Sequence, residues 1–261
     1  MTTRTVERAA GTYPGQAVPA ALLLSETTKT YGPDVTALDH VSLHVPRGSF
    51  LAVMGPSGSG KSTLLHCAAG LDTPTSGQVF IDGTEISTLS ETKRTLLRRD
   101  RIGFIFQSYN LLPSLTVEQN ITLPLRLART SPDRAWLGDV IERVGLGPYL
   151  GRRPDELSGG QQQRATIARA LVARPDVVFA DEPTGALDLD TAAGVLGLLR
   201  DLVGDLGQTV VMVTHDPNAA ARAHGTVVMA DGAIREYLAR PSAADLARSL
   251  TELRTDRGVR S

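Results

Sequence analysis

Several features that mark secreted, nucleic-acid-binding or membrane-spanning proteins are missing from this sequence. The single cysteine, Cys67, cannot form a disulfide within the chain, so nothing in the sequence indicates an oxidising compartment. The formal net charge of -1 leaves no basic surplus for binding nucleic acid. No apolar run approaches the roughly 20 residues that span a bilayer, and residues 1–16 lack the pattern of a secretory signal. We therefore expect a cytosolic protein that would reach a membrane only through a partner.

What the sequence does contain suits a globular protein with a real core, since 41% of its 261 residues are hydrophobic. Residues 1–20 are polar and interrupted by glycine and proline, which predicts a mobile N-terminal extension. Residues 21–240 are expected to form one domain. Residues 241–261 are expected to form an amphipathic helix and tail, because Ser242 and Asp245 match a capping box and the leucines that follow share one helical face (Leu246, Leu250 and Leu253).

The apolar patterns predict strands of two kinds. Residues 41–45 and 79–86 alternate polar and apolar side chains, as half-exposed antiparallel strands do. Continuous apolar runs, typical of strands buried on both faces of a parallel sheet, occur at 50–54, 177–181 and 209–215. Between about 108 and 157 the strand pattern gives way to helical patterns. The chain therefore predicts an α/β protein with a mixed sheet arrangement and an inserted helical subdomain.

Residues 55–62 follow the pattern G-x-x-x-x-G-K-S and stand between a buried-strand pattern and a helix pattern. The glycines allow successive backbone N–H groups to point at phosphate oxygens, and the helix that follows adds its positive N-terminal end. Lys61 would then reach the β- and γ-phosphates, and Ser62 would supply a hydroxyl to Mg²⁺. A chance glycine-rich turn is the alternative, which the flanking strand and helix argue against. The residues expected to bind nucleotide here are Gly55, Pro56, Ser57, Gly58, Ser59, Gly60, Lys61, Ser62 and Thr63.

Two consecutive carboxylates, Asp181 and Glu182, end the apolar run at 177–181. Asp181 would hold Mg²⁺, and Glu182 is placed to accept a proton from the attacking water. Strand ends are polar in any case, so this pair indicates function only in combination with the phosphate loop.

Residues 153–171 contain the most specific motif, LSGGQ followed by QQR. Ser158, Gly159 and Gly160 stand at the start of a long helix pattern, which predicts a second helix N-terminus that faces phosphate. An ordinary helix cap would explain a serine and one glycine but not the whole motif.

LSGGQ together with the phosphate loop resembles the ABC (ATP-binding cassette) ATPase family, and the resemblance extends from about Leu22 to Tyr237. It implies a P-loop NTPase (RecA-like) core with an antiparallel β subdomain and an inserted α-helical subdomain. It also implies ATP and Mg²⁺ as cofactors, a homodimer with ATP at the interface, and a separate integral membrane permease. In such a dimer the phosphate loop of one subunit faces residues 158–161, including Gln161, of the other. The subunit would then lie at the cytoplasmic face of the membrane, held there by the permease.

The same resemblance implies roles for single residues whose surroundings alone would indicate little. Gln107 resembles the glutamine that senses Mg²⁺ and the attacking water, and His215 resembles the switch histidine that contacts the γ-phosphate. Tyr31 resembles the aromatic residue that stacks on adenine, and Asp188 belongs to a loop that crosses the dimer interface. Without the resemblance, each would be taken as an ordinary strand-end or surface residue.

Within the family, residues 107–125 and the run from 157 to 188 resemble the branch of macrolide-exporter, lipoprotein-release and cell-division subunits, although Ala186 replaces a frequent asparagine. This branch implies export or extraction of a substrate from the membrane. A loop that family members dock against the permease corresponds to Leu111, Leu112, Pro113 and Leu115, which could equally be subdomain core. A soluble ABC ATPase with a non-transport partner and an importer subunit are the alternatives. Cys67 and Trp136 are expected to be packing residues, and the basic run 93–101 a solvated face.

Overall fold

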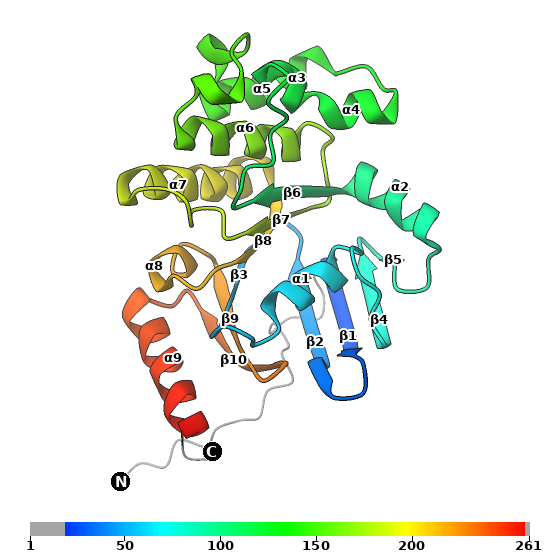
Figure 1. The fold of residues 1–261 in the computed structure, drawn as a ribbon, viewed down its shortest axis with the longest axis vertical. Helices are drawn as coiled ribbons and strands as arrows, with labels where there is room; N and C mark the ends of the chain where they lie inside the picture. The colour runs from blue at the N-terminus through cyan, green and yellow to red at the C-terminus, as the bar shows by residue number, and fades with distance from the viewer. Residues whose placement is uncertain (1–18, 259–261) are drawn as a thin grey trace.

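Two β-sheets and an all-helical region make up the protein, whose computed structural model describes residues 19–258 (Figure 1). The N-terminal extension expected at residues 1–20 lies almost entirely outside the described residues, and Ala20 already belongs to the first strand. No helix within residues 19–258 is long and apolar enough to cross a membrane.

The larger sheet is parallel except at one edge, where β9 and β10 form a hairpin. Its order is β10-β9-β3-β8-β7-β6, and the strands are β3 (Phe50–Met54), β6 (Ile102–Phe106), β7 (Val177–Asp181), β8 (Thr209–Val213), β9 (Gly225–Ala230) and β10 (Ala233–Ala239). Every residue of β3 and β8 is buried. The continuous apolar runs are therefore central parallel strands, as the sequence predicted.

The smaller sheet is antiparallel in the order β2-β1-β4-β5. Its strands are β1 (Ala20–Tyr31), β2 (Val35–Pro46), β4 (Ser76–Ile81) and β5 (Thr84–Glu85). The alternating pattern at 79–86 is a hairpin rather than one strand, because Asp82 and Gly83 take positive φ angles of 48° and 74° and reverse the chain. An Asp-Gly pair is the common sequence of such a tight turn.

Two apolar cores lie on opposite faces of the parallel sheet. Alternate residues of β3 divide between them: Phe50 belongs to the core beneath α6 (Gly159–Leu171) and α7 (Leu189–Leu206), while Leu51 belongs to the core shared with α1 (Lys61–Ala68) and the antiparallel sheet. Cys67 is buried in the second core, where burial raises the pKa of its thiol to about 12. The parallel sheet is thus the shared wall of both cores.

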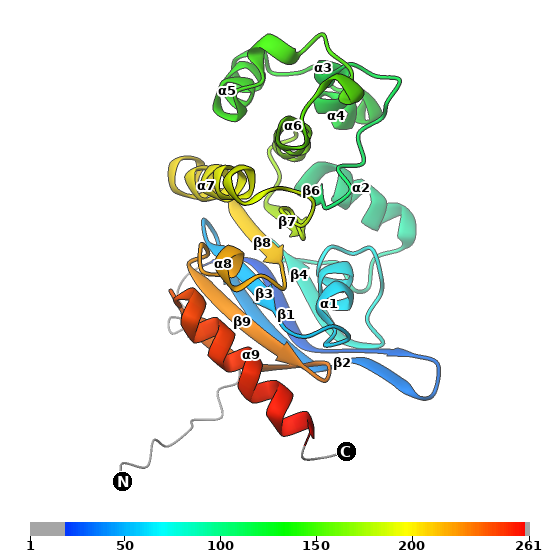
Figure 2. The same ribbon diagram turned by 60° about the vertical axis from the view of Figure 1, so that its left-hand side comes forward.

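Between β6 and β7 the chain forms helices only (Figure 2). Before α6 these are α3 (Val117–Ile121), α4 (Leu123–Ala128), α5 (Arg134–Val144), η1 (Gly147–Tyr149) and η2 (Pro154–Glu156). The group packs on α6 through α3 and α5. Within the helical patterns expected between about 108 and 157, the apolar period from 116 to 129 is divided at Thr122, since Pro124 lacks the N–H that would continue the first helix. Trp136 packs on the adjoining core, as expected.

The last helices close the other end of the molecule. They are α8 (Pro217–Ala220) and α9 (Ala243–Gly258), which contact each other. The remaining helix, α2 (Glu91–Arg101), packs beside β6. The predicted capping box of α9 is present, since Asp245 N–H donates to Ser242 Oγ at 3.2 Å and Ser242 N–H donates to Asp245 Oδ2 at 3.1 Å. Leu246, on the inner face of α9, is fully buried. The solvated face expected for residues 93–101 agrees with α2, in which no residue is buried.

Candidate active site

The phosphate-loop residues connect β3 to α1 at one edge of the parallel sheet. Gly60, the N-cap of α1, has a φ of 99°, and a Cβ there would collide with the carbonyl oxygen of Ala37. Only glycine fits this position. Lys61 Nζ donates to the carbonyl oxygens of Gly55 and Pro56, both at 2.9 Å, so the ammonium group lies over the loop.

The other residues of the loop differ in what they present to solvent. Ser57, Gly58 and Ser62 are exposed, whereas Ser59 is fully buried and its hydroxyl has no hydrogen-bond partner among the described residues. Ser59 could therefore meet a phosphate only through its main chain. Thr63 follows Ser62 in the first turn of α1, so both hydroxyls lie near the start of this helix.

Asp181 and Glu182 stand at the carboxyl end of β7, beside the phosphate loop. Glu182 has a φ of 46°, and its N–H donates to the Val213 carbonyl at 2.9 Å, which ties it to the neighbouring strand β8. Burial, followed by the nearby charge of Glu182, raises the pKa of Asp181, while His66 and Lys61 act in the opposite direction. Burial lowers the pKa of Lys61, against the pull of the two carboxylates. Burial of the Asp181 carboxylate is therefore only partly offset by the cations beside it.

Two further predicted residues meet this pair at the ends of neighbouring strands. His215, just beyond β8, has Nδ1 at 2.8 Å from Glu182 Oε1, and its side chain is 74% exposed. Gln107, just beyond β6, lies against the loop that follows Glu182, because a Cβ on Gly185 would come within 2.8 Å of Gln107 Nε2. In an open parallel sheet, the carboxyl ends of the strands form the usual binding edge.

Tyr31 ends β1 on the antiparallel sheet and keeps 45% of its surface exposed. Its hydroxyl donates to Asp72 Oδ2 at 2.8 Å. Burial and this hydrogen bond raise the pKa of Tyr31, and a side-chain hydrogen bond with Thr63 lowers it. The phenol thus lies between the phosphate-loop helix and the turn that follows it.

The LSGGQ motif forms the N-terminus of α6, on a different part of the molecule. Ser158 and Gln161 cap each other reciprocally: Ser158 N–H donates to Gln161 Oε1 at 2.9 Å, and Gln161 N–H donates to Ser158 Oγ at 3.3 Å. Side chains at Gly159 or Gly160 would collide with Tyr109 or Thr191. Both positions therefore accept only glycine, so the first turn of α6 begins with two residues that have no side chain.

Asp188 caps α7 rather than facing the phosphate loop of its own chain. Its Oδ1 accepts a hydrogen bond from Thr191 N–H at 3.0 Å, and this bond lowers the pKa of Asp188. Residues 158–161 and 188 stand at the starts of α6 and α7. Both helices lie on the side of the inserted helices, whereas α1 lies in the other half of the molecule (Figures 1 and 2). A single chain therefore brings together Lys61, Asp181, Glu182, His215 and Gln107, but not the LSGGQ motif.

The donor set fits MgATP. Within residues 19–258 no cluster of three or more His, Cys, Asp or Glu side chains could hold a metal alone. Mg²⁺ is usually held in nucleotide sites by one or two carboxylates or hydroxyls together with substrate phosphates and waters. Ser62, Gln107 and Asp181 at the edge of a glycine-rich loop match that pattern.

Sequence reasoning did not single out Gln163, which links the two halves. It is fully buried on α6, and its Nε2 donates to the Pro183 carbonyl at 2.6 Å, one residue after Glu182. A glutamine on the buried face of a helix that also carries the LSGGQ motif is the signal that could have indicated it.

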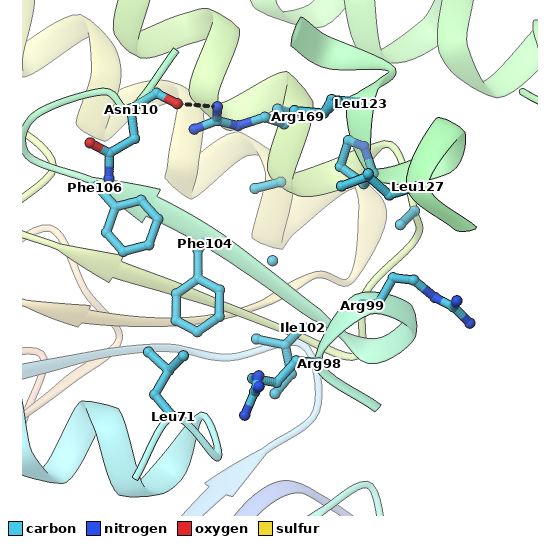
Figure 3. A pocket seen from close by; sticks show the side chains of 14 residues that line it. Leu71, Arg98, Arg99, Ile102, Phe104, Phe106, Asn110, Leu123, Leu127 and Arg169 are labelled. Carbon is cyan, nitrogen blue, oxygen red and sulfur yellow. Dashed lines mark hydrogen bonds between the residues drawn. The ribbon is translucent and has the colours of Figure 1, made fainter. Parts of the chain in front are cut away.

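A groove of about 420 Å³ opens between β6, α2, α4 and α6 (Figure 3). Its walls are apolar, with Leu71 and Leu127 both exposed at the rim. Three arginines and no carboxylate also line it: Arg98, Arg99 and Arg169. Arg98 pairs with Glu91 at 2.8 Å and Arg99 with Asp100 at 2.6 Å. Arg169 donates to the Tyr109 and Asn110 carbonyls, has no ion pair within residues 19–258, and has its pKa lowered by burial.

The fold, together with the phosphate loop and carboxylates at one edge of the parallel sheet, defines a P-loop ATPase with an inserted helical region. Similarities to known proteins agree with this class. A family model described as "ABC transporter" matches residues 38–185. An uncharacterised ABC transporter ATP-binding protein of Mycobacterium tuberculosis is 45% identical over 210 residues, which cover 80% of this chain and 85% of that protein. The chain belongs to the ABC transporter family.

Two named relatives and one solved structure refine the comparison. The lipoprotein-releasing system ATP-binding protein LolD of Bordetella avium is 45% identical, over 82% of this chain and 95% of that protein. The macrolide export ATP-binding/permease protein MacB of Paracoccus denitrificans is 50% identical over 76% of this chain, which spans only 30% of MacB. The dimeric post-hydrolysis structure of the ATP-binding cassette MJ0796 with ADP and Pi has a TM-score of 0.75 and 39% identity, over 85% of this chain and 99% of that chain.

These findings confirm the predicted fold class, the predicted branch of the family, and an ATP-hydrolysing subunit of an ABC transporter. The predicted dimer agrees with MJ0796, which is dimeric, and the predicted permease agrees with MacB, whose name includes one. They do not favour a soluble ATPase with another partner or an importer subunit. The roles of the single site residues stay predictions.

Proposed function

We propose that this chain hydrolyses MgATP to drive a separate permease that exports a substrate or extracts it from the membrane, and that it works at the cytoplasmic face. The observation that carries the proposal is the meeting of the phosphate loop with Glu182, His215 and Gln107 at one edge of the parallel sheet. LolD and MacB, whose names refer to lipoprotein release and macrolide export, support the direction of transport.

In this proposal the chain positions water and phosphate and takes part in little covalent chemistry. Lys61 releases its two loop carbonyls and binds the β- and γ-phosphates. Glu182 accepts the proton of the attacking water, and His215 orients the Glu182 carboxylate and contacts the γ-phosphate. Ser62, Gln107 and Asp181 would hold Mg²⁺, which would offset negative charge on the phosphates. Tyr31 would stack on the adenine.

The second half of each site would come from the partner chain. The N–H groups in the first turn of α6 would face the γ-phosphate bound on the partner, since the positive end of a helix dipole attracts anions. Asp188 would cross the same interface. Gln163, which holds Pro183, would connect α6 to the turn that carries Glu182.

The permease would dock in the groove of Figure 3. The neighbouring loop is shaped by the fully buried Asn120, whose amide bonds to the main chain of Leu112 and Leu115. Leu111 packs on the core, while Leu112 is 44% exposed, so only part of this loop is free to bind a partner. Because the lining carries arginines and no carboxylate, the docking segment should combine an apolar side chain with an acidic one.

The test is to purify the tagged Glu182→Gln variant from membranes of its host with ATP present, and to identify the integral membrane protein recovered with it. Recovery of a permease supports the proposal, and recovery of ribosomal or DNA-bound partners, or of none, contradicts it. Arg99→Glu should lower recovery of the permease. Arg134→Glu is the matched control, because Arg134 is exposed on α5 and does not line the groove.

A further inference from the structure

Three side chains outside the phosphate loop form a closed cluster around the candidate adenine site. Asp72 accepts from Lys29 Nζ at 2.6 Å through one oxygen and from the Tyr31 hydroxyl at 2.8 Å through the other. The Lys29 ammonium also lies 4.9 Å from the centroid of the Tyr31 ring. The ring is therefore held at its hydroxyl edge and covered on one face.

Asp72 is itself fixed to the helix that begins at the phosphate loop. It follows α1, and the N–H groups of Leu71 and Asp72 donate to the His66 carbonyl at 2.8 and 3.1 Å. The same turn joins β1, because Thr75 N–H donates to the Thr28 carbonyl at 2.8 Å. The Tyr31 hydroxyl also lies within hydrogen-bond reach of Thr63, in the first turn of α1, so the phenol is tied to both the start of this helix and the Asp72 turn that follows it.

The cluster is more than an ion pair on a surface. Lys29 and Asp72 side chains are 13% and 31% exposed, whereas Tyr31 keeps 45% of its surface open. An ion pair that served only the stability of this turn would not require the phenol as a third member. The phenol occupies the second carboxylate oxygen, so the carboxylate sets the angle of the ring.

We propose that Asp72 is a positioning residue for the nucleotide base: it fixes the Tyr31 ring relative to the phosphate loop, with Lys29 on one ring face and the base on the other. This rests on the proposed function, in which Tyr31 stacks on adenine. Asp72 acts through Tyr31 and does not touch the nucleotide. The ring that would stack on the base is thereby fixed to the same helix whose start carries the phosphate loop, which sets the distance between base and phosphates.

The experiment measures KM for ATP, kcat, and competitive inhibition by inorganic tripolyphosphate, which has no base, on variants of the full chain. Tyr31→Ala should raise KM about ten- to a hundredfold through lost stacking. Tyr31→Phe and Asp72→Ala should each raise KM about three- to tenfold, the range of one hydrogen bond. Their double variant should match Tyr31→Phe, since loss of the hydroxyl already removes the contact with Asp72. The inhibition constant of tripolyphosphate should not change.

Asp72→Asn keeps an acceptor for the phenol and should recover part of the loss. Asp176→Ala is the matched control, because Asp176 is another partly buried carboxylate beside an arginine, Arg101 at 3.8 Å, but stands at the far end of β7. Its KM should equal that of the parent.

Each other result has a defined meaning. If Tyr31→Ala raises KM while Tyr31→Phe and Asp72→Ala do not, the positioning role is wrong and the adenine role stands. If Asp72→Ala weakens the binding of tripolyphosphate as much as the binding of ATP, Asp72 shapes the phosphate loop, and the proposal is also wrong. If Tyr31→Ala leaves KM unchanged, the adenine role itself fails. Should Asp72→Ala not fold, Tyr31→Phe tests the same hydrogen bond while keeping the Lys29–Asp72 pair.

Discussion

The N-termini of α1 and α6 are both candidate phosphate sites, but they are built differently. At α1 a glycine loop wraps the helix end, and the Lys61 ammonium lies over it with Asp181 and Glu182 close by. At α6 the end is capped by the motif's own side chains, Ser158 and Gln161, which carry no charge. The first can bind phosphate alone, whereas the second offers only N–H groups and needs a phosphate brought by a partner. This difference predicts that a single chain binds nucleotide but that hydrolysis needs two.

The largest expected effect comes from Glu182→Gln, which removes the proton acceptor but keeps size and polarity. Turnover should fall about 10²- to 10⁴-fold, the usual contribution of general-base catalysis. ATP affinity, measured by equilibrium binding, should stay close to that of the parent. Normal turnover by this variant would show that Glu182 is not the general base.

Lys61→Ala tests the α1 side of the comparison. Loss of a charged hydrogen-bond donor should weaken ATP binding about ten- to a hundredfold. Isothermal titration with the isolated chain measures this, and Ser158→Ala in the same titration serves as control, because the α6 site should not contribute to binding by one chain. Equal losses in both variants would contradict the comparison.

Ser158→Asp tests the α6 side. Aspartate is as good an N-cap as serine, so the helix should keep its stability, but a carboxylate there would repel the phosphate of the partner. Steady-state turnover and ATP-induced dimerisation should each fall about tenfold, with unchanged melting temperature. A variant that dimerises and hydrolyses normally would show that the start of α6 does not face phosphate.

The smallest effect is expected from Asp181→Asn in the nucleotide-free chain. The folded-state pKa of Asp181 is raised by burial and by Glu182, so at neutral pH its charge destabilises the fold, and protonation relieves this as pH falls. The variant should therefore melt a few degrees higher than the parent at pH 7, and the gain should shrink as pH falls through the raised pKa. Thermal melts at several pH values measure this, and a constant difference would contradict the proposed cause.

Much of the fold could be predicted because its signals are local. The buried runs became parallel strands, the alternating segments became antiparallel ones, and the helical region stands where helical patterns replaced strand patterns. Two boundaries were wrong for local reasons as well: the turn at Asp82 and Gly83 divides the expected strand, and Pro124 divides the expected helix. In both places the sequence contains the residue that ends the element, the Asp82–Gly83 pair or Pro124, but the apolar pattern runs past it.

The residues that sequence reasoning missed share a different property. Asp72 meets Tyr31 and Gln163 meets Pro183 across long stretches of chain. Neither partner can be identified from its own neighbours in the sequence. In the structure, Gln163 is identified by its complete burial. Asp72 is identified because both of its carboxylate oxygens accept hydrogen bonds.

The sequence by itself determined the phosphate loop, the strand-end carboxylates and the LSGGQ helix start, because each depends on a few adjacent residues and on the element that follows. Only the tertiary structure decided which of these meet. The order of the parallel sheet places β3, β8, β7 and β6 side by side, which brings Lys61, His215, Glu182 and Gln107 to one edge. It also leaves α6 in the other half of the molecule. Strand order and helix packing depend on contacts between distant segments, and those contacts are absent from any local pattern.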